Sequence, residues 1–230
     1  MAGRVFAITG ASGVLGSAVA KAAAAQGTRV ALIDHAKHAD ALEACGPEAI
    51  MLGGVDLTDA VAAGAAVDAV ADRFGGLDAV INVAGGFKWE TLENSLMQDW
   101  HRLFLMNVQT AANTSRAAIP HLKRSLAGRI VNIGANAALK AAAGMGPYAA
   151  SKAGVHALTE SLAEELKADG VTVNAVLPSI IDTPTNRADM PNADFSAWVS
   201  PDDLAAVILF LASPDAGAVT GALIPVTGRV

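Results

Sequence analysis

The sequence has little cysteine, tyrosine or other aromatic content. Its 230 residues include one cysteine, Cys45, and one tyrosine, Tyr148, and only 4% are aromatic. A single cysteine cannot form an internal disulfide, so a secreted disulfide-stabilised scaffold is excluded and Cys45 is expected to be a loop thiol. With 53% hydrophobic and 17% charged residues, the composition is that of a globular chain rather than a disordered one.

Targeting segments and strong positive charge are also missing. The N-terminal MAGRVF has no charged region followed by an apolar one, so no secretory signal is predicted. The longest uncharged run, residues 5–20, contains three glycines and is shorter than the roughly 20 apolar residues of a membrane span. A net charge of −6 argues against nucleic acid and anionic membranes as partners. We expect a cytoplasmic protein that acts on a small molecule, without a metal, because its five histidines show no ligand cluster.

Short β-branched runs alternate with alanine-rich stretches of helical length. This alternation predicts a doubly wound α/β fold: one domain over residues 1–230, with a parallel seven-stranded sheet covered by helices on both faces. The expected strands are 4–9, 29–33, 49–52, 78–82, 129–133, 171–177 and 221–226, and the expected helices are 14–26, 58–74, 96–124, 148–168 and 201–212. Residues 178–200 form a long proline-containing stretch that we expect to be a lid or substrate-binding loop.

A glycine-rich segment, TGASGVLG, joins the first strand to the first helix. Gly10, Gly13 and Gly16 allow a tight turn and a close approach of backbone amides to a phosphate, and the helix N-terminus adds a positive dipole end. A glycine triplet alone is weak evidence, but its strand–helix context favours dinucleotide binding. Asp34 ends the second strand, where a carboxylate binds the ribose hydroxyls and repels a 2′-phosphate. NAD(H) is therefore favoured, and NADP(H) is the alternative.

Tyr148 and Lys152 are four residues apart in YAASK, so they share one face of a helix. An ammonium beside a phenol favours the phenolate and lowers the phenol pKa, which suits a general acid working near neutral pH. The simpler interpretation is a surface tyrosine above a solvated lysine. The pair follows the fifth strand of a nucleotide-binding sheet, and this position favours the interpretation as a catalytic pair.

Together, TGASGVLG, Asp56, NVAGG, Asn107, YAASK and PSIIDTP resemble the short-chain dehydrogenase/reductase family over nearly the whole chain. The resemblance implies that Asn107 kinks its helix and supports a proton relay, and that Lys152 binds the nicotinamide ribose. It also implies pairing of subunits through helices 96–124 and 148–168, as a homodimer or homotetramer. The expected cofactor contacts are Gly10, Ser12, Gly13, Val14, Leu15, Gly16, Asp34, Asp56, Leu57, Asn82, Ala84, Gly85, Tyr148, Lys152, Pro178, Ile181 and Thr183.

The chain departs from the family pattern at the usual catalytic serine, 13 positions before the tyrosine, where Ala135 stands. Losing one such donor typically costs about 2.7–4 kcal/mol of transition-state stabilisation. Asn136 is a candidate replacement. Residues 128–200 are similar to quinonoid dihydropteridine reductases, which also have alanine there and reduce an electron-poor ring. Lid residues Met190, Phe195 and Trp198 could stack on such a ring, or could form the apolar underside of the lid.

The sequence thus predicts an NADH-preferring reductase with Tyr148, Lys152 and Asn107 as its catalytic residues. The expected acceptor is an electron-poor small molecule, with a quinonoid dihydropteridine as the specific candidate. Two alternatives stay open: a carbonyl or 3-oxoacyl reductase that lacks the usual serine, and a catalytically weak dinucleotide-binding sensor.

Overall fold

The computed structural model describes all 230 residues, and its centre is a parallel sheet in the order β3-β2-β1-β4-β5-β6-β7. The strands are β1 Val5–Thr9, β2 Arg29–Asp34, β3 Ile50–Gly53, β4 Ala79–Asn82, β5 Arg129–Ile133, β6 Thr172–Pro178 and β7 Leu223–Val226. Four of them, β1, β4, β5 and β6, are buried along their whole length, as expected for a sheet covered on both faces. The predicted seven-stranded Rossmann sheet is confirmed.

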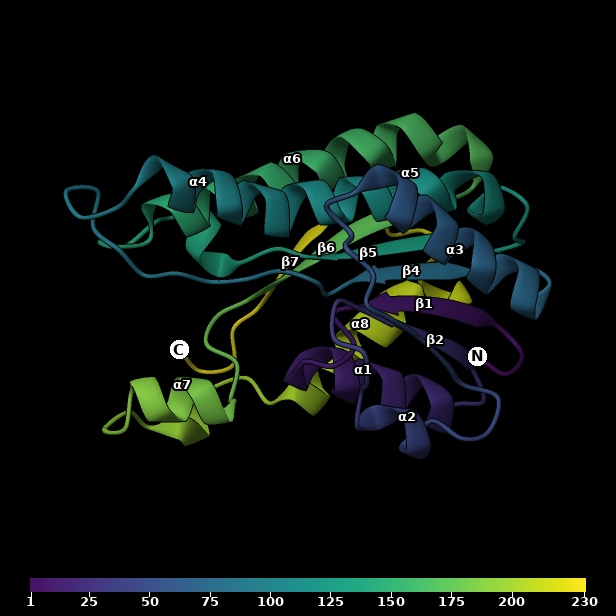
Figure 1. Cartoon of the computed structure of the whole chain (residues 1–230), viewed down its shortest axis with the longest axis horizontal. Helices are drawn as coiled ribbons and strands as arrows, with labels where there is room; N and C mark the ends of the chain where they lie inside the picture. The colour runs from purple at the N-terminus through teal and green to yellow at the C-terminus, as the bar shows by residue number, and fades with distance from the viewer.

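Helices form a layer on each face of the sheet (Figure 1). One apolar cluster joins the sheet to α1 and α8, and a second joins its other face to α3, α5 and α6. The helices are α1 Val14–Ala25, α2 Ala41–Ala44, α3 Ala60–Phe74, α4 Met97–Phe104, α5 Thr110–Leu122, α6 Gly146–Leu166, α7 Pro184–Asp189 and α8 Pro201–Ala212. None of these helices has the length and apolar character needed to span a membrane.

The predicted helix over residues 96–124 consists of three segments. Between α4 and α5 lies a π-helical turn, η1 Leu105–Gln109, which contains Asn107. A π turn widens the helix by one residue and is frequent at functional sites. The first residues of α3 also differ from the expectation: the helix begins at Ala60, because the Asp59 carboxylate caps it by accepting the Val61 N–H.

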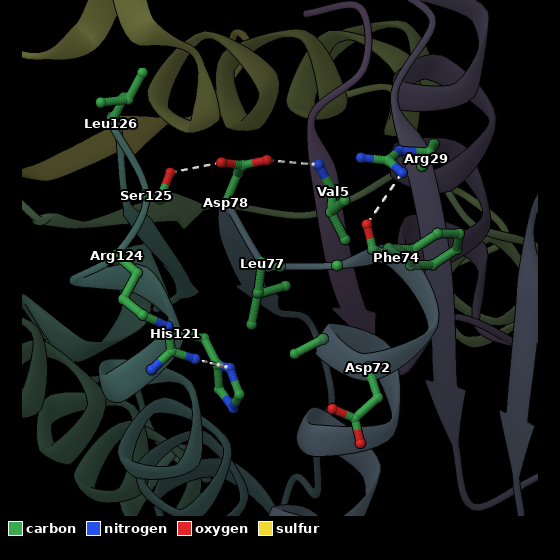
Figure 2. Close-up of a pocket in the computed structure, with 13 residues that line it drawn as sticks. Val5, Arg29, Asp72, Phe74, Leu77, Asp78, His121, Arg124, Ser125 and Leu126 are labelled. Atoms are coloured by element: carbon green, nitrogen blue, oxygen red, sulfur yellow. Dashed lines mark hydrogen bonds between the residues drawn. The ribbon is translucent and has the colours of Figure 1, made fainter.

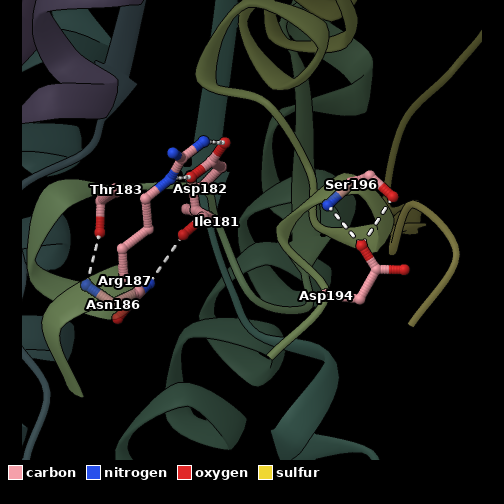
Figure 3. A network of polar contacts seen from close by, with 7 residues as sticks. All are labelled: Ile181, Asp182, Thr183, Asn186, Arg187, Asp194 and Ser196. Atoms are coloured by element: carbon pink, nitrogen blue, oxygen red, sulfur yellow. Dashed lines mark hydrogen bonds and ion pairs between the residues drawn. The ribbon is translucent and has the colours of Figure 1, made fainter. Parts of the chain in front are cut away.

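Residues 178–200, expected to be irregular, include α7 and a short 3₁₀ turn, η4 Phe195–Ala197. Thr183 caps α7 by accepting the Asn186 N–H at 3.1 Å, and Pro184 follows at the first helical position. Polar contacts stabilise both α7 and η4 (Figure 3). Asp182 accepts two hydrogen bonds from Arg187, at 2.6 and 2.7 Å, and Asp194 accepts two from Ser196.

The strand order reverses between β1 and β4, where the chain crosses from one half of the sheet to the other. In open parallel sheets, a crevice opens at such a switch point beyond the carboxyl ends of the strands, and ligands bind there. The fold therefore places the glycine-rich segment after β1 and the NVAGG segment after β4 on the two sides of one crevice.

Candidate active site

A cavity of about 930 Å³ lies at this crevice. It brings together the loop after β1, the ends of β2 and β4, the π turn and the first part of the 178–200 segment. Most of the predicted cofactor contacts line it: Gly10, Ser12, Gly13, Val14, Leu15, Gly16, Asp34, Asp56, Leu57, Ala84, Gly85, Ile181 and Thr183. Residues 102–110 supply a wall that the sequence did not predict, through Arg102, Leu105, Met106 and Thr110.

The glycine-rich loop has the geometry of a dinucleotide cradle. Gly10 has φ +64°, and a Cβ at Gly16 would lie 2.2 Å from the Gly10 carbonyl oxygen, so the loop and the start of α1 pack at a distance that only glycine allows. No side chain caps α1 at Gly13, so the amides of its first turn are not satisfied by a cap. A pyrophosphate at this helix N-terminus fits these residues.

Two carboxylates line the adenosine half of the cavity. Asp34 accepts the Ser12 N–H at 2.8 Å and the Ala36 N–H at 3.0 Å, which fixes its carboxylate at the end of β2. Asp56 accepts hydrogen bonds from the hydroxyl and the backbone N–H of Thr58, and these lower the pKa of its carboxyl. Both carboxylates are therefore fixed as hydrogen-bond acceptors, which suits ribose hydroxyls or an amino group.

Four of the predicted cofactor contacts are not part of the cavity wall: Asn82, Pro178, Tyr148 and Lys152. Asn82 is buried and donates to Ser115 Oγ at 3.0 Å and to Asn132 Oδ1 at 2.8 Å. Its side chain therefore cross-links β4 to β5 and α5 instead of facing a ligand. Pro178 is buried at the end of β6. These two side chains support the site from behind.

Tyr148 and Lys152 lie on α6, as predicted, but burial governs their proton affinities. Lys152 is buried and donates to the Ile133 carbonyl at 2.7 Å, and burial lowers its pKa to about 8. Burial raises the pKa of Tyr148 to about 12. The expectation that Lys152 lowers the tyrosine pKa is therefore corrected: desolvation of the phenol is the larger effect.

Phe87 also contacts the tyrosine. The two ring centroids are 4.9 Å apart at 80°, an edge-to-face arrangement that orients the phenol and shields it from water.

Asn107 links the loop after β4 to the helix that carries Tyr148. Its Oδ1 accepts the Gly86 N–H at 2.8 Å, and its Nδ2 donates to the Gly86 carbonyl at 3.1 Å and to Ser151 Oγ at 2.9 Å. The Ser151 hydroxyl in turn donates to the Tyr148 carbonyl at 2.7 Å. A Cβ at Gly85 would lie 2.5 Å from Asn107 Oδ1 and 3.5 Å from Lys152 Nζ, so Asn107 and Lys152 meet beside this glycine.

The position of the usual serine holds no hydroxyl. Ala135 is buried at 2% exposure, and its N–H points to His156 Nε2 at 3.3 Å. Asn136 follows at the start of a 3₁₀ turn, η2 Asn136–Ala138; its half-buried side chain makes no hydrogen bond within the chain. The side-chain amide of Asn136, next to Ala135, therefore has no hydrogen-bond partner within the chain.

The aromatic residues of the 178–200 segment mostly pack on each other. Trp198 is only 8% exposed and lies 4.8 Å from the Phe195 ring, whose other neighbour is the Arg187 guanidinium. The suggestion that Trp198 stacks on a substrate is therefore corrected, because its ring forms the underside of this segment. Met190 is half-buried at the end of α7. Figure 3 shows the polar face of the same segment.

A second cavity, of about 680 Å³, lies at the amino ends of the strands (Figure 2). Several of its polar groups already have partners: Asp78 accepts from the Val5 N–H and the Ser125 hydroxyl, and Arg29 donates to the Phe74 carbonyl. Arg124 donates to His121 Nδ1 at 2.8 Å. None of the predicted site residues contributes to this cavity.

Besides the wall from residues 102–110, three residues around Tyr148, Lys152 and Ala135 were not predicted: Phe87, Ser151 and His156. Ser151 lies inside YAASK, so its place in the motif was the available signal, whereas its bonds to Asn107 and Tyr148 depend on the π turn. Phe87 and His156 meet Tyr148 and Ala135 only through the fold, and no local pattern marks them.

The fold and this site define a dinucleotide-dependent oxidoreductase of the Rossmann type. A family model described as "short chain dehydrogenase" matches residues 4–194, and the chain belongs to this family. It is therefore an enzyme, an NAD(P)-dependent oxidoreductase.

Relatives with known names support the assignment. The chain is 34% identical to meso-2,3-butanediol dehydrogenase of Serratia marcescens, covering 98% of this chain and 93% of that protein. It is 32% identical to a 3-oxoacyl-[acyl-carrier-protein] reductase of Vibrio cholerae, covering 98% and 96%. Among solved structures, carveol dehydrogenase from Mycobacterium avium in complex with NAD aligns with a TM-score of 0.88 at 27% identity, covering 99% of this chain and 97% of that one.

Proposed function

We propose that this chain is an NADH-preferring reductase that passes hydride to an electron-poor small molecule, with a quinonoid dihydropteridine as the specific candidate. The observation that carries the proposal is Ala135. Its methyl group occupies the position of the usual serine, and its N–H is directed to His156. Without a hydroxyl to polarise a carbonyl, the site suits an acceptor that needs positioning and one proton.

Asp34 supports the preference for NADH. Its carboxylate is fixed at the end of β2 and lines the cavity, where it is suited to two ribose hydroxyls and would repel a 2′-phosphate. Arg102 is the only lysine or arginine of the cavity wall. It lies on α4, whereas Asp34 ends β2. The segment that follows β2 therefore contributes no arginine or lysine to the cavity wall that could accommodate the phosphate of NADP(H).

The nicotinamide ring, when bound, supplies the hydride. Tyr148 holds the proton: with a pKa of about 12 its phenol stays protonated at neutral pH and can donate as the acceptor gains negative charge. Lys152 carries a positive charge at pH 7, which stabilises the phenolate left behind, and it is directed by the Ile133 carbonyl. Asn107 fixes the loop after β4 against α6 through Gly86 and Ser151.

A carbonyl or 3-oxoacyl reductase is the second candidate. The names of the Serratia and Vibrio relatives favour it, since both act on hydroxyl or carbonyl groups. In this case the Asn136 amide would donate to the carbonyl, because it lies next to Ala135 and has no partner within the chain. A dinucleotide-binding sensor with little turnover would bind NADH and reduce neither kind of acceptor.

NADH oxidation separates these functions. The wild type should turn over quinonoid dihydropterin much faster than a panel of ketones and 3-oxoacyl thioesters. Ala135→Ser should gain ketone reduction, up to about 100-fold, because it restores a donor. Ala137→Ser, in the same turn, is the matched control and should gain nothing. Ketone reduction by the wild type that is as efficient as by Ala135→Ser would contradict the proposal, and Asn136→Ala would then test the second candidate.

We further propose that subunits pair through α4, α5 and α6. Phe104, at the end of α4, is 51% exposed and does not line the cavity, so its ring is available to a second copy. Burying this surface against a second copy would remove it from water. Light scattering should give a mass of two or four chains, and Phe104→Glu should reduce it to one.

A further inference from the structure

His156 is a buried histidine with a defined contact at the site. It lies on α6 one turn beyond Lys152, is 6% exposed, and faces the end of β5. Its Nε2 lies 3.3 Å from the Ala135 nitrogen and can accept that N–H only when it carries no proton of its own. Gly134 makes room for the ring, since a Cβ there would lie 2.5 Å from Nε2.

The chain leaving β5 is thus tied to α6 at two adjacent points. Lys152 Nζ donates to the Ile133 carbonyl at 2.7 Å, and the Ala135 N–H is directed to His156. Between them, Gly134 donates to the Val176 carbonyl at 2.9 Å and continues the sheet. Ile133 lines the cofactor cavity. The contact between Ala135 and His156 therefore fixes both this part of the cavity wall and the Ile133 carbonyl that accepts from Lys152.

We infer that His156 is a positioning residue: its neutral ring holds the Ile133–Ala135 segment against α6, and its protonation releases the segment and weakens dinucleotide binding. A protonated imidazole has no lone pair for the Ala135 N–H, and it adds a second positive charge near Lys152. The inference uses the role of Lys152 in holding the cofactor, and so rests on that part of the proposed function.

The surroundings keep the ring neutral at pH 7. Burial is the largest effect and lowers the pKa of His156; Lys152 lowers it further, and Glu160 raises it. Both charged groups belong to α6 itself. The other elements in contact present Gly134 and Ala135 after β5 and Leu177 on β6, none of which carries a charge. The neutral form is thus lost only as the pH falls below the ordinary histidine range near 6.5.

The test measures binding rather than turnover. The dissociation constant for NADH, followed by energy transfer from tryptophan to the dihydronicotinamide, is measured from pH 5 to pH 8 for the wild type, His156→Gln and His156→Leu. Glutamine can place an acceptor oxygen near the Nε2 position but does not titrate, whereas leucine offers no acceptor. His101→Gln is the matched control, because His101 is an exposed histidine on α4 that does not line the cavity.

The wild type and His101→Gln should bind NADH progressively more weakly at acid pH, with a midpoint equal to that of the His156 ring in an NMR titration. His156→Gln should keep the affinity of the wild type within about twofold at pH 7.5 and lose the acid dependence. His156→Leu should bind about five- to tenfold more weakly at pH 7.5, the effect of one lost hydrogen bond. An acid dependence that persists in His156→Gln, or disappears in His101→Gln, would overturn the inference.

The outcome is independent of the acceptor. If no acceptor is reduced but these binding results hold, the proposed reductase activity fails and the role of His156 stands. If NADH oxidation proceeds with dihydropterin while the acid dependence persists in His156→Gln, the activity stands and the role of His156 fails.

Discussion

Replacing Gly85 by alanine adds one methyl group at the point where the cofactor cavity, Asn107 and Lys152 meet. The new Cβ would lie 2.5 Å from Asn107 Oδ1, where ordinary van der Waals contact begins at 3.4 Å. The amide must therefore move by nearly 1 Å, that is, 3.4 minus 2.5 Å, and its three hydrogen bonds to Gly86 and Ser151 cannot all survive. The backbone of Gly85 is not itself strained, since it does not have a positive φ.

The size of the effect follows from the bonds that break. Each typical hydrogen bond contributes about 1 kcal/mol, so losing two lowers the free energy of unfolding by about 2 kcal/mol. For a chain of this size that lowers Tm by about 4–8 °C. Denaturant unfolding and thermal melting both measure it. NADH affinity should fall as well, because Gly85 lines the cavity.

Gly64→Ala is the matched control. Gly64 lies inside α3, and a Cβ there meets nothing within 4 Å, so the same change should stabilise the protein by about 0.5–1 kcal/mol. If Gly85→Ala unfolds at the same temperature as the wild type, the contact of Gly85 with Asn107 is not as close as described and the reasoning fails.

Three further substitutions test the proton donor, the buried lysine and the cofactor preference. Tyr148→Phe should lower kcat by about 10²–10⁴ with unchanged NADH affinity, and a fall below tenfold would exclude the phenol as acid. The pKa of Lys152 is about 8 in the folded chain and about 10.5 in the unfolded chain. Between pH 8 and pH 10.5 the amine is therefore protonated in the unfolded chain and neutral in the folded one. The stability of the wild type relative to Lys152→Met should therefore rise from pH 8 to pH 10.5, by at most about 3 kcal/mol in urea unfolding, and a flat difference would contradict the burial of a charged lysine. Asp34→Ser should shift the ratio of KM values for NADPH and NADH about tenfold toward NADPH; an unchanged ratio would show that Asp34 does not face the ribose.

The sequence was sufficient to predict the sheet because each strand has a local signal. The runs that became β1, β4, β5 and β6 are rich in β-branched and other apolar residues, and glycines mark the junction of β1 with α1. The break in the helix at Asn107 was expected only from the family resemblance. Nothing in LMNVQ distinguishes a π turn from an α turn, because the two differ in the spacing of their backbone hydrogen bonds and not in the residue types that they contain.

The site was less predictable where it depends on burial and on contacts between distant segments. Phe87 meets Tyr148 across 61 positions, that is, 148 minus 87, and spacing in the sequence gives no sign of it. Trp198 is aromatic and lies in the expected lid, yet it is covered by its own segment. Residue type alone cannot separate a side chain that faces a ligand from one that supports the loop.

The pKa values of Tyr148 and Lys152 bear on the role of Tyr148 as a proton donor. The i, i+4 spacing of Tyr148 and Lys152 suggested a phenol made more acidic by its neighbour, but Lys152 is buried and Tyr148 half-buried, and the desolvation of each group disfavours its charged form. With a pKa of about 12, the phenol is a phenolate in only about one molecule in 10⁵ at pH 7. Oxidation of an alcohol needs that phenolate as a base, whereas reduction needs the protonated phenol that is already present. The phenol of Tyr148 is therefore already in the form that the proposed reduction uses, and it can supply the proton without first being protonated.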